Sequence, residues 1–154
     1  MPNQSPDFHI RSARLDEKAA LEALQLAASL MWDSDREALL ANPDAVAIPE
    51  AQFEAGQVYV AERAGEIVGL GVVLPRFDGE AELDGLFTRP DAWRGGVGRA
   101  LVAEAMARAR AWRSDFLHVI GNPNAEGFYL ACGFEHCGEE QTQFGPAMRM
   151  RLRV

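Results

Sequence analysis

The sequence predicts one α/β domain, built on a mixed and mostly antiparallel sheet that carries helices on both faces. Segments of β-favouring residues form a group in the first half of the chain and then alternate with amphipathic helical segments. A glycine-rich turn joins one of these strands to a long helix and a further strand, which is typical of a parallel crossover. The length of 154 residues, with no repeat or linker inside it, predicts a single domain over residues 1–154.

The N-terminal third predicts a short strand followed by helices. Residues 8–13 form the strand, and Asp16 is expected to cap the next helix. Apolar residues recur there at three- and four-residue steps, which indicates an amphipathic helix. These residues are Ala20, Leu21, Leu24, Ala27, Ala28 and Met31. A shorter helix is expected over residues 34–40, and residues 41–57 are expected to be irregular or briefly helical.

The middle of the chain predicts three strands and a long helix. Residues 58–63 and 67–74 form a hairpin around a turn that contains Gly65. Residues 81–88 form the fourth strand, and the helix covers residues 97–113. Its apolar face is made of Leu101, Val102, Ala105, Ala109 and Trp112.

The C-terminal third continues the alternation of strand and helix. Residues 116–120 are expected to form an apolar strand that is covered on both faces. Asn122 and Pro123 are the cap and first residue of a helix, and Gly133 ends it in the left-handed conformation. Two antiparallel strands then close the sheet, over residues 134–138 and 147–154. In the last strand apolar side chains alternate with arginines.

The composition excludes several classes of function. Lys+Arg number 15 and Asp+Glu number 23, so the net charge of -8 argues against a general nucleic-acid binder or a protein bound to anionic membranes. Cys132 and Cys137 are too few for a disulfide framework and lack the spacing of a zinc site. The three histidines are scattered over different elements. No apolar run is long enough for a membrane helix and no signal peptide is apparent, so we expect a soluble, cytoplasmic protein without a metal.

A glycine-rich loop before the long helix is the first candidate site. Glycines let a backbone approach a ligand, and the first N–H groups of a helix are unpaired, so an anion such as phosphate fits there. A tight turn that only needs flexible residues is the alternative. A P-loop is excluded because no lysine follows, and a dinucleotide fingerprint is excluded because Leu101 stands at its third small position. The loop comprises Trp93, Arg94, Gly95, Gly96, Val97, Gly98 and Arg99.

A tyrosine on the following helix is the second candidate. Tyr129 lies where a side chain can face the crevice between two parallel strands. It can equally be an ordinary residue at the edge of the core. Acids on the fourth strand are the third candidate, because period-two spacing places Glu80, Glu82 and Asp84 on one face. They form either a solvated acidic face or the general base at the mouth of a cleft.

Together these motifs resemble the GNAT superfamily of acyl-CoA-dependent N-acyltransferases, over nearly the whole chain. The family's loop reads Gln/Arg-x-x-Gly-x-Gly/Ala and corresponds to residues 93–98, with Trp93 at its first position. The later signature Asn-x-x-Ala-x-x-x-Tyr, followed by Gly-Phe, corresponds to residues 122–129 and 133–134.

The resemblance implies a site for acetyl-CoA as co-substrate, in a V-shaped opening between the fourth and fifth strands. The loop would hold the pyrophosphate, and residues 86–88 would pair with the pantetheine arm and polarise the thioester carbonyl. The positions implied are Leu86, Phe87, Thr88, Arg94, Gly95, Gly96, Val97, Gly98, Arg99, Asn122 and Tyr129.

The implied reaction is direct transfer of the acetyl group to a primary amine of a small molecule or a protein. Glu82 is the expected base, Asp84 is the alternative, and Tyr129 would donate to the departing thiolate. No metal and no covalent enzyme intermediate are implied. A non-catalytic acyl-CoA sensor of the same fold remains an alternative, as does an unrelated domain that binds another phosphorylated ligand.

The acceptor and the oligomeric state stay open, a homodimer included. In such folds the acceptor pocket comes from segments that correspond to residues 31–57 and 141–147. Their aromatic and acidic side chains are expected either to form an amine-accepting wall or to be ordinary packing and solvated charge. They are Trp32, Phe53, Phe144, Asp33, Asp35, Glu37 and Glu50.

Overall fold

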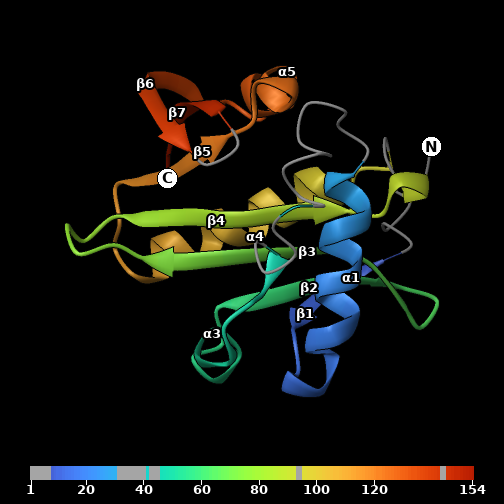
Figure 1. Ribbon diagram of the computed structural model, residues 1–154. Helices are drawn as coiled ribbons and strands as arrows, with labels where there is room; N and C mark the ends of the chain where they lie inside the picture. Colours follow the sequence, from blue (N-terminus) through green and yellow to red (C-terminus); the bar gives the residue numbers. More distant parts are fainter. Residues whose placement is uncertain (1–7, 31–40, 42–45, 93–94, 143–144) are drawn as a thin grey trace, which may run out of the picture.

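The computed structural model describes residues 8–30, 41, 46–92, 95–142 and 145–154. In this part of the chain seven strands form one sheet in the order β1-β2-β3-β4-β5-β7-β6 (Figure 1). Every neighbouring pair is antiparallel except β4 and β5, so the predicted mixed sheet with one parallel pair is confirmed. The strands are β1 His9–Ser12, β2 Val58–Arg63, β3 Glu66–Pro75, β4 Ala81–Thr88, β5 Phe116–Gly121, β6 Glu135–Thr142 and β7 Gly145–Arg153.

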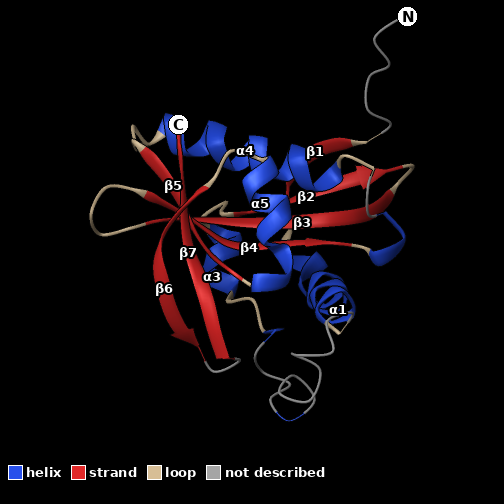
Figure 2. Cartoon of the chain, turned by 90° about the horizontal axis from the view of Figure 1, so that it is seen from above, coloured by secondary structure: helices blue, strands red, loops and turns tan. Residues whose placement is uncertain are grey.

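Helices lie on both faces of the sheet, as predicted. Figure 2 shows α4 and α1 on opposite sides of strands β2 to β4. The short α3, in the region predicted to be irregular or briefly helical, packs on the same side as α1. The helix predicted over residues 34–40 lies outside the described residues. The helices are α1 Lys18–Ser29, α3 Glu50–Glu54, α4 Val97–Ala111 and α5 Glu126–Ala131.

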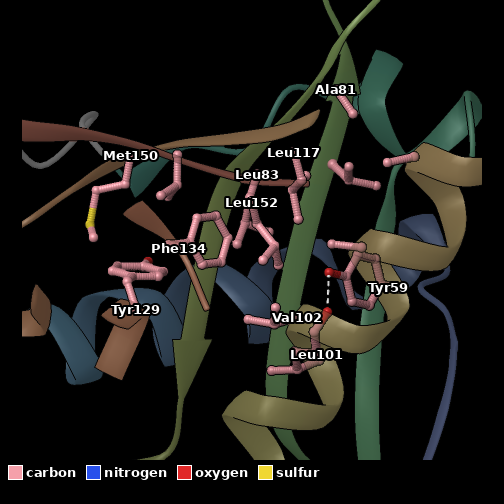
Figure 3. Close-up of a cluster of buried hydrophobic side chains, with 14 of the residues drawn as sticks. Tyr59, Ala81, Leu83, Leu101, Val102, Leu117, Tyr129, Phe134, Met150 and Leu152 are labelled. Atoms are coloured by element: carbon pink, nitrogen blue, oxygen red, sulfur yellow. Dashed lines mark hydrogen bonds between the residues drawn. The ribbon is translucent and has the colours of Figure 1, made fainter. Parts of the chain in front are cut away.

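Two hydrophobic clusters, one on each face, hold the sheet to these helices. The larger lies under α4 and α5, and the smaller lies under α1 and α3. In the larger cluster the Tyr59 hydroxyl donates a hydrogen bond of 2.7 Å to the carbonyl oxygen of Leu101 (Figure 3). The end of the Tyr59 side chain lies over Gly71 of β3, and a Cβ at Gly71 would overlap it. A glycine is therefore required at this close approach.

Two local predictions at helix ends are wrong. Asp16 does not cap α1, because the chain enters the helix through a 3-10 turn over Leu15–Glu17. There the Glu17 carboxylate accepts the backbone N–H of Arg14 at 2.8 Å and pairs with Arg11, so Glu17 organises the turn that Asp16 was expected to start. Trp112 does not join the buried face of α4, because it lies at the C-cap with 39% of its surface exposed.

The parallel pair is held together at one end only. Ala81 to Leu83 of β4 pair with Leu117 to Val119 of β5, and no pairing follows beyond them in the described strands. Just before the pair, the Glu80 carboxylate accepts the N–H groups of Asp115 and Phe116, both at 2.9 Å. The prediction that Glu80 shares an acidic face with Glu82 and Asp84 is therefore wrong, because the Glu80 carboxylate is bonded to the backbone at the start of β5. Beyond the pair β5 leaves the plane of β4, together with β6 and β7 (Figure 1).

Among the described helices, none has the length and apolar character needed to cross a membrane.

Candidate functional site

The N-terminus of α4 presents unpaired amides at an open surface. Its N-cap, Gly96, has a φ of 83°, which a residue with a side chain adopts only at a cost. A Cβ at Gly96 would have no heavy atom of a described residue within 4 Å, so the space beside its α-carbon is open in the part of the chain that the structure describes. The first backbone bond of the helix runs from the Ala100 N–H to the Gly96 oxygen at 3.1 Å. The N–H groups of residues 97–99 precede it and have no acceptor within the helix.

The neighbours of this cradle match the predicted loop in part. Gly98 is close-packed, since a Cβ there would lie 3.0 Å from the Phe128 ring of α5. Arg99 is exposed at the first turn of α4. Two predicted members, Trp93 and Arg94, lie outside the described residues. Gly95 is exposed, and a Cβ there would lie 3.4 Å from a guanidinium nitrogen of Arg63.

Backbone groups of β4 line the diverging end of the parallel pair. The Arg89 N–H donates to the Val68 oxygen at 2.9 Å, and bonding alternates along an antiparallel pair. Phe87 therefore also bonds to β3, while the N–H groups of Leu86 and Thr88 point away from β3. They face the side on which β5 has diverged. The family resemblance implied that the pantetheine arm pairs with residues 86–88 on this side.

Tyr129 lies at the same end, deep in the larger cluster. Its ring makes edge contacts with Phe128 and Phe134, with centroids 5.3 and 5.4 Å apart. Figure 3 shows Tyr129 next to Phe134. A Cβ at Gly121 of β5 would lie 3.1 Å from it. The hydroxyl makes no hydrogen bond with any residue in the described part of the chain. Desolvation raises the pKa of Tyr129 to about 12, so the phenol keeps its proton near neutral pH.

The turn that carries α5 is built as predicted. The Asn122 side chain accepts the N–H of Asn124 at 2.8 Å, and Pro123 is the first residue of the helical turn. Gly133 ends α5 with a φ of 101°. Asn122 therefore caps the turn between β5 and Tyr129.

The two acids of β4 differ in position. Glu82 is half-buried beside His118 of β5, and desolvation, followed by the nearby charge of Asp84, raises its pKa. Arg76 and Arg149 act in the opposite direction on the same group. Asp84 is the extra residue of a β-bulge, since Val72 pairs with Gly85 and Val73 with Leu83. The Asp84 side chain is exposed to solvent, but partial desolvation by the surrounding protein raises its pKa.

A pocket of about 450 Å³ opens beside Glu82, on the face of the sheet opposite α4. Six side chains around it concern its chemistry: Arg76, Phe77, Glu82, His118, Ile120 and Arg149. The prediction that β5 is covered on both faces is wrong, because Ile120 is 44% exposed. The side chains of β5 alternate between the core and this pocket. Among the described residues, no helix covers the sheet on the pocket side.

The sequence reasoning did not find most of this pocket. Arg76 and Phe77 belong to the turn between β3 and β4, and Arg149 belongs to β7. The alternation of arginines along the last strand is the one signal that indicated a polar face there. Of the expected amine-accepting wall, Phe53 is buried in the core under α1, and Glu50 is exposed. The other members lie outside the described residues: Trp32, Asp33, Asp35, Glu37 and Phe144.

Across the described residues, no three His, Cys, Asp or Glu side chains come together in a way that would hold a metal ion. Cys132 packs partly buried against the larger cluster, and burial raises the pKa of its thiol. A nucleophilic cysteine needs the opposite shift, so Cys132 is suited to packing.

Comparisons with known proteins agree with this geometry. Residues 24–134 match the model of the acetyltransferase (GNAT) family. No curated protein matches the chain. A GCN5-related N-acetyltransferase from Rhodopseudomonas palustris is similar in structure, with a TM-score of 0.78, 20% identity and coverage of 100% of this chain and 99% of that one.

Two further solved structures cover 95% of this chain. The ribosomal-protein-alanine N-acetyltransferase from Brucella melitensis is 27% identical, with a TM-score of 0.69 and 99% of its own length covered. YncA from Salmonella typhimurium, solved with acetyl-CoA, is 24% identical, with a TM-score of 0.70 and 93% of its length covered.

Proposed function

The chain belongs to the GNAT acetyltransferase family, and from this premise we propose that it transfers the acetyl group of acetyl-CoA to a primary amine. One observation carries the proposal. The open amide cradle at Gly96 and the outward N–H groups of Leu86 and Thr88 lie at the diverging end of β4 and β5. Acetyl-CoA has an anionic pyrophosphate, which fits the amide cradle, and an extended arm with amide groups, which fits the N–H groups of β4. The acetyl-CoA in the YncA structure supports the same donor.

The residues present fit that donor. The cradle has room in front of Gly96, and its N–H groups and helix dipole favour a pyrophosphate. Arg99 adds a positive charge to the same turn. The N–H groups of Leu86 and Thr88 would bind the arm as a neighbouring strand does and polarise the thioester carbonyl. Acetyl-CoA itself supplies the activated acetyl group as a thioester.

Glu82 is the proposed base. An alkylammonium is not a nucleophile, and removing its proton at pH 7 from a pKa of about 10.4 costs roughly 4.6 kcal/mol. Glu82 faces the pocket from the strand that binds the donor, and its raised pKa strengthens it as a base. Asp84, the extra residue of the bulge, is the alternative. The amine nitrogen then forms a bond to the acetyl carbon while the carbon–sulfur bond breaks.

Tyr129 is the proposed acid. Its hydroxyl is protonated near neutral pH and is not engaged by any described residue, so it is available to donate a proton to the leaving sulfur. In the balance of the reaction, the ammonium loses two protons. Glu82 takes the first before the attack, and the thiolate receives the proton of Tyr129. The second proton leaves the nitrogen as the amide forms and passes to solvent, from which Tyr129 regains its own. No covalent enzyme intermediate is required.

Release of free CoA from acetyl-CoA, measured with a thiol reagent over a panel of primary amines, tests the proposal. We expect amine-dependent release, and we expect Tyr129→Phe to lower kcat while the KM for acetyl-CoA changes little. Tyr59→Phe is the matched control, because Tyr59 is a second buried tyrosine whose hydroxyl is bonded to Leu101. Binding of acetyl-CoA without release by any amine would refute catalysis and indicate an acyl-CoA-binding module.

A further inference from the structure

The acceptor pocket contains positive charge that the proposed chemistry does not use. The protein carries a net charge of -8, yet two arginines, Arg76 and Arg149, line this pocket beside its two carboxylates, Glu82 and Glu140. A pocket made only to accept an alkylammonium would not place two guanidinium groups there, because like charges repel the substrate. These arginines therefore indicate a second functional group on the acceptor.

Both arginines retain donors for a ligand. The Arg149 Nε lies 4.0 Å from the Glu140 carboxylate, and both side chains are 44% exposed, so this contact is weak. Arg76 pairs with Asp78 at 3.0 Å through one terminal nitrogen, Nη2. A guanidinium has five N–H donors, so neither contact exhausts its side chain. A carboxylate or phosphate in the pocket would be bound in the fork geometry that arginine favours.

The strand register fixes the separation of the two charged regions. Glu82 of β4 is beside His118 of β5, and Ile120 of β5 is beside Arg149 of β7. Two strand spacings of about 4.8 Å and a two-residue step of about 6.6 Å place the Cα atoms of Glu82 and Arg149 roughly 12 Å apart. Their side chains extend into the same pocket and close most of this separation. A short carbon chain spans what remains.

We infer that the acceptor is a small primary amine that also carries an anionic group, with its amine at Glu82 and its anion at Arg149 and Arg76. The inference rests on the proposed function and adds the class of acceptor to it. Arg149 is thus a specificity-determining residue, because it distinguishes an aminocarboxylate from a simple amine or a diamine. Ile120 and Phe77, which both line the pocket and are exposed, supply apolar surface for the carbon chain.

Three amines with the same four-carbon chain test the inference: 4-aminobutanoate, butylamine and 1,4-diaminobutane. They differ only in whether the far end is anionic, neutral or cationic. We expect kcat/KM, measured by CoA release, to be highest for 4-aminobutanoate, by about 10- to 100-fold over butylamine, which is the factor that a hydrogen bond to a charged group supplies. The diamine should be the poorest of the three.

Paired variants of β7 provide the control. Arg149→Gln should remove the preference for 4-aminobutanoate, so that the ratio of its kcat/KM to that of butylamine falls to about one. Arg153→Gln removes the same charge from the same strand and face, outside the pocket lining, and should keep the preference. Circular dichroism and the thermal shift with acetyl-CoA verify that both variants fold.

The outcomes separate the two levels of the claim. CoA release that is as fast with butylamine or the diamine, and insensitive to Arg149→Gln, would overturn the acceptor class and leave the acetyltransferase in place. No release with any of the three amines would remove the proposed function, and the acceptor class with it.

Discussion

Substitution of Gly96 separates the stability of the loop from its ability to bind an anion. With a φ of 83° and no heavy atom within 4 Å of a Cβ, Gly96→Ala introduces backbone strain without a clash. The left-handed conformation costs a residue with a side chain about 1–2 kcal/mol. At the size of this chain, each kcal/mol lowers Tm by roughly 2–4 °C, so we expect a fall of about 2–8 °C. Gly96→Glu should lower the ligand-free Tm by a similar amount.

The two variants should differ once acetyl-CoA is added. At 100 times its Kd a ligand adds about 2.7 kcal/mol, which corresponds to a rise in Tm of roughly 5–11 °C in the unaltered protein. Gly96→Ala should keep most of this rise because the amides remain in place. Gly96→Glu should abolish it, because a carboxylate then occupies the space meant for the pyrophosphate. Differential scanning fluorimetry gives both numbers, and equal rises in the two variants would refute the anion cradle.

Three further predictions follow from groups beside or beneath the site. Because the pKa of Glu82 is raised, the acidic limb of the kcat/KM profile should lie above the ordinary glutamate value of 4.5. The pH–rate profile of Glu82→Gln should lack that limb. A profile identical to that of the unaltered enzyme would exclude Glu82 as the base. Arg11 lowers the pKa of Glu17 to about 2, so this stabilisation is complete above about pH 4.5 and is lost as the pH falls towards 2. Glu17→Gln should lower the free energy of unfolding at pH 7 by about 1–3 kcal/mol in urea titrations, with little difference left at pH 2. Gly71→Ala drives a methyl group into the Tyr59 ring and should cost about 1–3 kcal/mol by the same titration; an unchanged midpoint would contradict the close approach.

The elements of the proposed donor side follow from local signals in the sequence. The cap at Asn122, the left-handed glycines at 96 and 133 and the start of α4 at Val97 depend on residues within one or two turns. Each has a strong conformational preference that tertiary contacts do not need to override. The β4 boundaries, Ala81–Thr88, are likewise set by turn residues on both sides. These features were therefore predictable from the chain alone.

The proposed acceptor side depends on contacts between distant segments and was not predictable in the same way. Arg76, His118 and Arg149 come from three different parts of the chain, and the registers of β3 with β4, of β4 with β5 and of β5 with β7 bring them together. The apolar run of β5 suggested burial on both faces, since composition alone does not reveal that one face lies beside a pocket. A carboxylate can also accept backbone hydrogen bonds instead of facing a site, and the Glu80 carboxylate accepts the N–H groups of Asp115 and Phe116 at the start of β5.

In the proposed mechanism, the bulge at Asp84 allows one strand to face both substrates. Ala81 and Leu83 pack in the larger cluster under α4, so Glu82 between them faces the other side, where the pocket lies. Strict alternation would then send the side chain of Leu86 to the pocket side and that of Phe87 towards α4. The extra residue at the bulge reverses the two faces beyond it. As a result, Leu86 packs against the larger cluster and Phe87 packs against the smaller one. The proposed base therefore faces the acceptor, while four residues later the side chain of Leu86 points to the donor's face. A strand without the bulge would keep Glu82 and lose this division, so the irregularity belongs to the proposed mechanism and not only to the packing.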